Sequence, residues 1–147
     1  SSGKIRQANE GCACTMNSIL KQFIKHLTVG ENEVVLLDME AGVEHFGRGV
    51  DNSVDLILMI VDPSFESLKL TKKIQQLGDS IGKTVFFVLN KVNELVLPTM
   101  LESIDDQSKV LAVISTDTEI ARKGLVGDEL MMEIPEIHML ARKILKQ

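Results

Sequence analysis

Short stretches of continuous apolar residues alternate along the chain with segments whose apolar residues recur every three or four positions. The continuous runs lie at 34–37, 56–61, 85–89 and 110–114. Runs that are apolar at every position are typical of parallel strands buried on both faces of a sheet. Their alternation with helical segments predicts an α/β domain with a parallel sheet flanked by helices.

The segments with helical periodicity are bounded by residues that favour helix ends. Ser64 is a plausible N-cap and Gly82 a stop for one of them, and Pro is favoured in a first helical turn. Met131, Met132 and Met139 are expected to fill the core rather than to bind a soft metal. The predicted helices are 15–27, a segment between Ser64 and Gly82, a shorter helix near Pro98, and a last helix that opens at Ile134-Pro135.

Composition and charge narrow the class of protein. Of the 147 residues, 44% are hydrophobic and 25% are charged, which predicts one globular domain over residues 1–147. The formal net charge is −5 and the chain has neither Tyr nor Trp, which argues against nucleic-acid binding. No apolar run reaches the roughly 18 residues of a membrane-spanning helix.

Cys12 and Cys14 are the whole cysteine content. Cysteines separated by one residue rarely form a disulfide, because the geometry of the bond is demanding. The lack of a cysteine framework predicts a reducing, cytoplasmic location. The opening residues Ser1-Ser2-Gly3 include no Met and no signal peptide, and fit either a tag remnant or the cut end of a longer protein.

Polar residues follow each predicted strand. Ligands bind beyond the carboxyl ends of the strands in open α/β sheets, so these positions form a candidate site. The simpler interpretation, in which each strand merely ends in a polar turn, stays open beside it. The residues are Asp38, Asp62, Asn90-Lys91 and the segment from Ser115 to Asp117.

The first strand end, Asp38 to Gly42, has a spacing that suits phosphate chemistry. An acid at a strand tip can hold a magnesium-bound water, and a glycine four residues later lets a backbone N–H approach a terminal phosphate. This spacing alone is a weak signal. A non-nucleotide alternative makes Asp38 a phosphate acceptor in a receiver-like module.

The third strand end, Asn90 to Asn93, has the form of a nucleotide-base loop. Guanine-specific enzymes carry Asn-Lys-x-Asp, whose carboxylate accepts two hydrogen bonds from the base. Asn93 stands at that position here, and a carboxamide has only one acceptor atom. The substitution disfavours guanine and favours adenine.

Several of these stretches together resemble one family. They are Gly11-Cys12-Ala13-Cys14, Val34 to Gly42 followed by Glu44-His45-Phe46-Gly47-Arg48-Gly49, Val61-Asp62-Pro63-Ser64, and Asn90-Lys91-Val92. In order and spacing the chain resembles the C-terminal part of CooC-type ATPases, the accessory proteins of carbon monoxide dehydrogenase maturation. These belong to the larger class that contains MinD, ParA and the nitrogenase iron protein.

The resemblance implies an ATP-driven dimerisation switch that helps to load nickel into carbon monoxide dehydrogenase. It implies a catalytic role for Asp38 and nucleotide binding by Gly42, Asn90 and Lys91, with Ser115 and Asp117 in a segment that flanks the base. It also implies that Cys12 and Cys14 face their twins across a homodimer and hold nickel or zinc. ATP and magnesium are the implied cofactors of the intact protein.

The 147 residues contain no Gly-x-x-x-x-Gly-Lys-Ser/Thr phosphate loop. The resemblance implies that the fold is of the phosphate-loop NTPase type without its first strand, and that about a hundred family residues precede this part. We therefore expect ATPase activity from the intact protein but not from this chain alone. The alternatives are a partitioning or scaffold ATPase of the MinD/ParA type, and a non-catalytic binding module.

Overall fold

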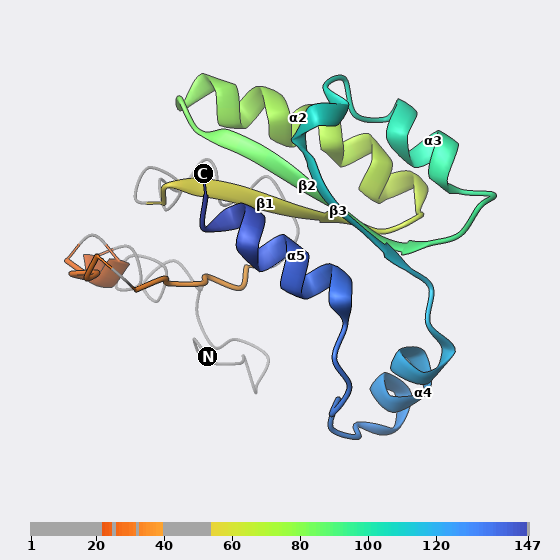
Figure 1. Cartoon of the computed structure of the whole chain (residues 1–147). Coiled ribbons are helices and arrows are strands. Elements are labelled where there is room, and N and C mark those ends of the chain that lie inside the picture. Colours follow the sequence, from red (N-terminus) through yellow and green to blue (C-terminus); the bar gives the residue numbers. More distant parts are fainter. Residues whose placement is uncertain (1–21, 25, 32, 40–53, 147) are drawn as a thin grey trace, which may run out of the picture. The chain divides into compact units, whose positions relative to one another are not determined.

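A computed structural model describes residues 22–24, 26–31, 33–39 and 54–146 (Figure 1). The chain divides into two units, Ser1–Asp55 and Leu56–Gln147. In the first unit, residues 22–24 are helical, as predicted, but residues 33–39 have no regular secondary structure. The strand predicted at 34–37 is thus not formed within the described residues. An extended segment becomes a strand only when a neighbour pairs its N–H and C=O groups, and no described segment pairs with this one.

The second unit is an α/β layer structure. The described strands form one parallel sheet in the order β1-β2-β3. Among the described residues, no helix is long and apolar enough to cross a membrane. The elements are β1 (Leu56–Val61), α2 (Phe65–Ser80), β2 (Thr84–Val92), α3 (Leu97–Glu102), the 3₁₀ turn η3 (Gln107–Lys109), β3 (Val110–Ser115), α4 (Thr118–Val126) and α5 (Pro135–Ile144).

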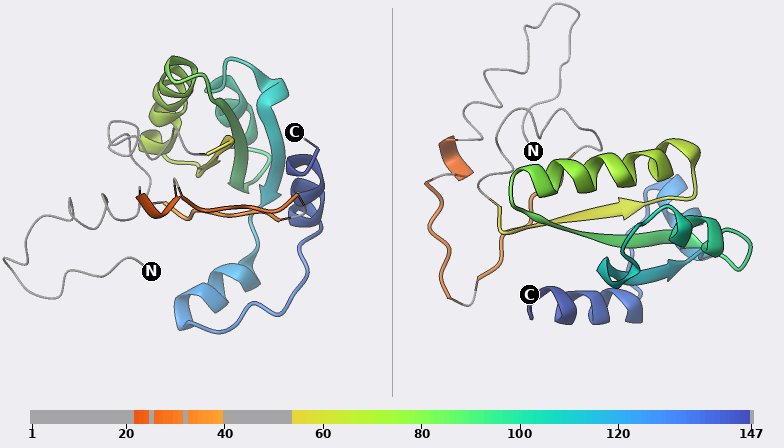
Figure 2. Two further views of the ribbon diagram at one scale, coloured as in Figure 1. Left: turned by 90° about the vertical axis from the view of Figure 1, so that its left-hand side faces the viewer. Right: turned by 90° about the horizontal axis from the view of Figure 1, so that it is seen from above.

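The central strand β2 lies in the middle of the core. Phe87, Val88 and Leu89 are completely buried, and Val85 is nearly so. Helices α2 and α3 lie over one face of the sheet and α5 over the other (Figures 1 and 2). The predicted strands at 56–61, 85–89 and 110–114 are confirmed, and burial on both faces explains why the apolar run of β2 is continuous.

The ends of α2 follow the sequence signals. The Ser64 side chain accepts a hydrogen bond from the Ser67 N–H at 3.2 Å, so Ser64 is the N-cap. Gly82 has a φ of 67°, a left-handed conformation that most side chains disfavour. The predicted cap and stop are therefore both confirmed.

Helix α5 packs on β3 through a cluster that contains Val88, Leu111 and Leu140. The pairing of β2 with β3 shifts register between Phe87 and Val88, where Val110 and Ala112 are the partners and Leu111 is left out. The Lys143 ammonium on α5 donates to the Leu111 carbonyl at 2.5 Å. This contact satisfies a carbonyl at an irregular position of the ladder and ties the helix to the strand.

Helix α4 has no counterpart in the sequence prediction. Asp117 caps its start, and Gly127, with a φ of 74°, ends it.

The expectation that methionines fill the core is wrong for Met131 and Met139, which are 82% and 56% exposed. Apolar periodicity identifies one face of a segment, but it does not show whether another element covers that face.

We predict that Gly78→Ala destabilises the second unit by about 1–3 kcal/mol, as overpacking of a core does. A Cβ at Gly78 would lie 2.4 Å from Val85 Cγ2 and 2.9 Å from the Lys83 carbonyl oxygen, so α2 would have to move off β2. Urea unfolding measures the change. Gly124→Ala in α4 is the matched control, because its Cβ meets nothing within 4 Å and should be neutral or stabilising. Equal destabilisation by the two variants contradicts this packing.

Candidate functional site

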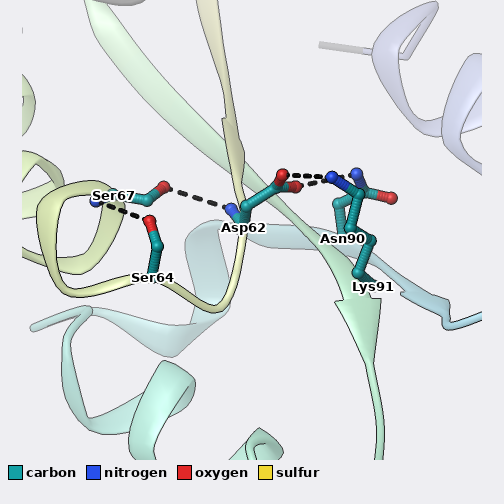
Figure 3. A network of polar contacts seen from close by, with 5 residues as sticks. All are labelled: Asp62, Ser64, Ser67, Asn90 and Lys91. Carbon is teal, nitrogen blue, oxygen red and sulfur yellow. Dashed lines mark hydrogen bonds and ion pairs between the residues drawn. The ribbon is translucent and has the colours of Figure 1, made fainter.

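The carboxyl ends of β1 and β2 bring three polar side chains together (Figure 3). The Asn90 Nδ2 group donates to Asp62 Oδ1 at 2.8 Å, and the Lys91 ammonium donates to Asp62 Oδ2 at 2.6 Å. One carboxylate thus binds two consecutive residues of the neighbouring strand. The Asp62 side chain is 39% exposed and that of Lys91 is 63% exposed, so the cluster lies at the surface of this sheet edge.

An irregularity in β2 makes this convergence possible. Consecutive side chains of a regular strand point to opposite faces, so two of them do not normally reach one carboxylate. Leu89 pairs with Val113 and Val92 pairs with Ser115, which leaves one more residue on β2 than on β3. Lys91 has a φ of 54°, and it is the one non-glycine residue with a positive φ in the described part of the chain. Asn90 and Lys91 therefore lie in a β-bulge, a feature that redirects side chains.

Asp62 is itself fixed by the start of α2. Its N–H donates to Ser67 Oγ at 3.1 Å, and its carbonyl accepts from the Ser64 N–H at 2.8 Å. Ser64 and Ser67 are linked in turn through the N-cap of the helix. The carboxylate therefore projects from a backbone that is held at both its N–H and its C=O.

Asn93 closes the turn after β2. Its Oδ1 accepts hydrogen bonds from the N–H groups of Leu95 and Val96, at 3.0 and 3.1 Å. This is an Asx turn, in which the side-chain oxygen satisfies the backbone ahead of it. The single acceptor atom of Asn93 is therefore used within its own loop.

A cavity of about 230 Å³ lies where β3, α4 and α5 meet. Ser115 and Asp117 both line it, and Asp117 also accepts hydrogen bonds at the start of α4. The Thr116 N–H donates to the Val92 carbonyl at 2.9 Å, which joins this segment to the end of β2. Asn90 and Lys91 do not line the cavity. Its walls are Ile114, Ser115, Thr116, Asp117, Ile120, Met132, Glu133, Ile134, Pro135 and Glu136.

The other predicted site residues all belong to the first unit, Ser1–Asp55. Asp38 belongs to the first unit and lies in the irregular segment 33–39. Gly42, Cys12 and Cys14 lie outside the described residues. Within those residues, no group of three or more His, Cys, Asp and Glu side chains is arranged to hold a metal ion.

Asp62 was predicted as one of the polar strand ends of the candidate site, but no role was assigned to it. It follows β1 directly in Asp62-Pro63-Ser64, which is one of the stretches that carried the resemblance. The signal for it was the position of an acid at a strand tip next to the tip that bears Asn90. The sequence alone did not show that both tips share one hydrogen-bond network.

Comparison with known proteins finds sequence similarity to proteins that are named as ATP-binding. An uncharacterized ATP-binding protein of Methanocaldococcus jannaschii is 47% identical over 92% of this chain and 54% of its own length. A second such protein of the same organism is 32% identical over 89% of this chain and 52% of its own length. The carbon monoxide dehydrogenase accessory protein CooC of Rhodospirillum rubrum is 34% identical over 85% of this chain and 48% of its own length.

The chain is thus similar in sequence to CooC over most of its own length. The names of the other two proteins say that they bind ATP, and together these similarities support a CooC-like ATP-binding family. The chain spans about half the length of the curated relatives it matches. No family model matches it. The parallel sheet with flanking helices is consistent with the phosphate-loop NTPase type of fold.

We predict that Lys91→Gly is more stable than Lys91→Ala by about 1 kcal/mol. Both variants lose the ion pair with Asp62, but only alanine retains the cost of a left-handed backbone at this position. Chemical denaturation of the two variants gives the difference. In a regular strand the order would be reversed, because glycine destabilises strand interiors. A Lys91→Ala variant as stable as Lys91→Gly therefore contradicts the bulge.

Proposed function

We propose that this chain is the C-terminal portion of a CooC-type ATPase, which acts as an ATP-driven dimerisation switch in nickel insertion into carbon monoxide dehydrogenase. The observation that carries the proposal is the oriented Asn90 carboxamide at the end of β2, in a chain similar to ATP-binding proteins. The similarity to CooC supports the accessory role. The partner and the dimer are part of the proposal.

Asn90 is the residue that contacts the adenine base. Its Nδ2 group points to Asp62, so its Oδ1 faces away from that carboxylate, and no described residue donates to it. Adenine offers an amine donor at N6 beside an acceptor at N7, a pair that one carboxamide can match with its oxygen and an N–H. Ser115 and Asp117 flank the base from the end of β3, and Lys91 supports the loop.

The hydrogen bonds that Asn93 accepts within its own loop support adenine over guanine as the bound base. A guanine site needs a side chain after the lysine that accepts two hydrogen bonds from the base. The Asn93 oxygen already accepts from Leu95 and Val96. Its amide group can only donate, so the position does not offer the acceptors that guanine requires.

The phosphates are bound elsewhere in the intact protein. Most of the affinity for a triphosphate comes from backbone N–H groups, a helix N-terminus and lysine side chains around the phosphates. We assign these groups to a phosphate loop in a preceding segment, in agreement with a chain that spans about half of its relatives. Asp38 positions water through magnesium and Gly42 approaches the terminal phosphate. The 147-residue chain alone then has no measurable micromolar affinity for magnesium-ATP.

Cys12 and Cys14 form the metal-carrying part of the switch. Two thiolates from each of two chains supply the four soft ligands of a closed tetrahedral site. Dimerisation on ATP would create this site, and hydrolysis would release its nickel to the client enzyme. A reducing, cytoplasmic compartment keeps the thiols available for metal.

Base selectivity tests the nucleotide proposal. We predict that the full-length protein binds ATP more tightly than GTP, and that Asn90→Ala lowers its ATP affinity about tenfold, the order expected for a bidentate base contact. Titration calorimetry with both nucleotides gives the affinities. Gln76→Ala removes an exposed carboxamide from α2 and is the control. A protein that prefers GTP, or an Asn90→Ala variant with unchanged ATP affinity, shows that this loop does not read the base.

Metal binding tests the accessory role. We predict that the reduced protein binds about half a zinc or nickel ion per chain and forms a dimer as it does so, because four thiolates close one tetrahedral site. Metal titration combined with light scattering measures both quantities. The paired substitution Cys12→Ser, Cys14→Ser should abolish both. If this variant binds metal equally well, the cysteine site is wrong and a partitioning-type ATPase of the same class becomes the better assignment.

A further inference from the structure

Both oxygens of the Asp62 carboxylate accept hydrogen bonds from β2. Oδ1 accepts from Asn90 and Oδ2 accepts from Lys91 (Figure 3). Its backbone is held by Ser64 and Ser67 at the start of α2. The carboxylate thus contacts Asn90 from a backbone that is held on both sides, and this contact is the one that bears on the base.

A carboxamide by itself can present either its oxygen or its amino group to a base. A carboxylate is an acceptor only, so the group that Asn90 turns toward Asp62 must be the amino group. The Asn90 oxygen is thereby turned the other way. The remaining N–H of the amino group is still able to donate.

This fixed orientation has a consequence for base selection. Adenine presents a donor at N6 and an acceptor at N7, which matches an outward oxygen and one N–H. Guanine presents two acceptors, O6 and N7, on the same edge. An Asn90 side chain that is free to turn could place its amino group against guanine. One that is held by Asp62 places its oxygen against guanine O6, and the two acceptor oxygens repel each other.

The bulge is the structural cost of this arrangement. Lys91 adopts a left-handed backbone conformation, which is unfavourable for residues other than glycine. The extra residue also interrupts the hydrogen bonding between β2 and β3. In return, two neighbouring side chains of β2 reach the carboxylate of Asp62, the residue that follows β1. Strain of this kind is concentrated at functional sites, and here it lies on the residue next to the proposed base contact.

From these contacts we infer that Asp62 is a positioning residue, which sets the preference for adenine over guanine by fixing the orientation of the Asn90 carboxamide. The inference rests on the proposed function, in which Asn90 contacts the base. It assigns to β1 a part in base recognition, although Asp62 itself does not touch the nucleotide.

Asp62→Asn in the full-length protein is the direct test. Asparagine has nearly the same shape, but it can present either a donor or an acceptor, so Asn90 becomes free to turn. We expect the ratio of ATP to GTP affinity to fall about tenfold, as expected when a hydrogen bond to a charged group is lost. The affinity for inorganic triphosphate, which has no base, should not change. Asp105→Asn is the matched control, because it removes an exposed ion pair with Lys72 from the segment that leads into β3.

A double-mutant cycle separates positioning from general stabilisation. If Asp62 acts through Asn90, then Asp62→Asn should have no further effect on ATP or GTP affinity in an Asn90→Ala background. Additive effects of the two substitutions overturn the inference, as does an unchanged nucleotide ratio in Asp62→Asn alone. An Asn90→Ala variant that binds ATP normally overturns the proposed function and this inference with it.

If Asp62→Asn does not fold, a measurement on the unmodified protein tests whether Asp62 holds the Asn90 carboxamide. The hydrogen bond to Asp62 should slow the exchange of the Asn90 side-chain amide protons with solvent, relative to those of exposed Gln76. Heteronuclear NMR resolves both groups. Equal exchange rates for Asn90 and Gln76 show that the carboxamide is not held, and overturn the inference.

Discussion

Strand β2 hydrogen-bonds to a parallel neighbour on each of its edges, and the second unit is organised around this fact. A strand paired on both sides and covered on both faces has no exposure to water along its middle, which is why Phe87, Val88 and Leu89 are completely buried. Parallel pairing also brings the carboxyl ends of the strands to one edge of the sheet. The polar residues that end β1, β2 and β3 therefore gather there and can act together.

The pairing of β2 with β3 becomes irregular between Leu89 and Val92, at the residues of the candidate site. Up to Leu89 its side chains alternate between the two helix layers, and from Asn90 a bulge turns the next two toward Asp62. The same segment remains attached to β3 through the contact of Thr116 with Val92. The bulge thus changes the direction of two side chains without detaching the strand, and the rigid sheet supports the carboxamide at its edge.

Elements whose signals are local were predictable from the sequence. Ser64 caps α2 and Gly82 ends it because a side-chain acceptor and a left-handed glycine act within a few residues. The register of β2 against β3 depends on residues far apart in the chain, so neither the bulge nor the partnership of Asp62 with Asn90 could be predicted. The apolar run at 34–37 predicted a strand, but strand formation also requires a partner. The places of Asp62, Asn90, Lys91, Ser115 and Asp117 at or just after strand ends were predictable, because each follows an apolar run.

The central claim is that the edge formed by Asp62 and Asn90 reads the adenine base of ATP. A crystal structure of the full-length protein with magnesium-ADP tests it most directly. The account predicts that the Asn90 oxygen lies within hydrogen-bond distance of adenine N6, while its amino group keeps the contact with the Asp62 carboxylate. A base bound away from Asn90, or an Asn90 amino group turned from Asp62 to the base, would contradict it.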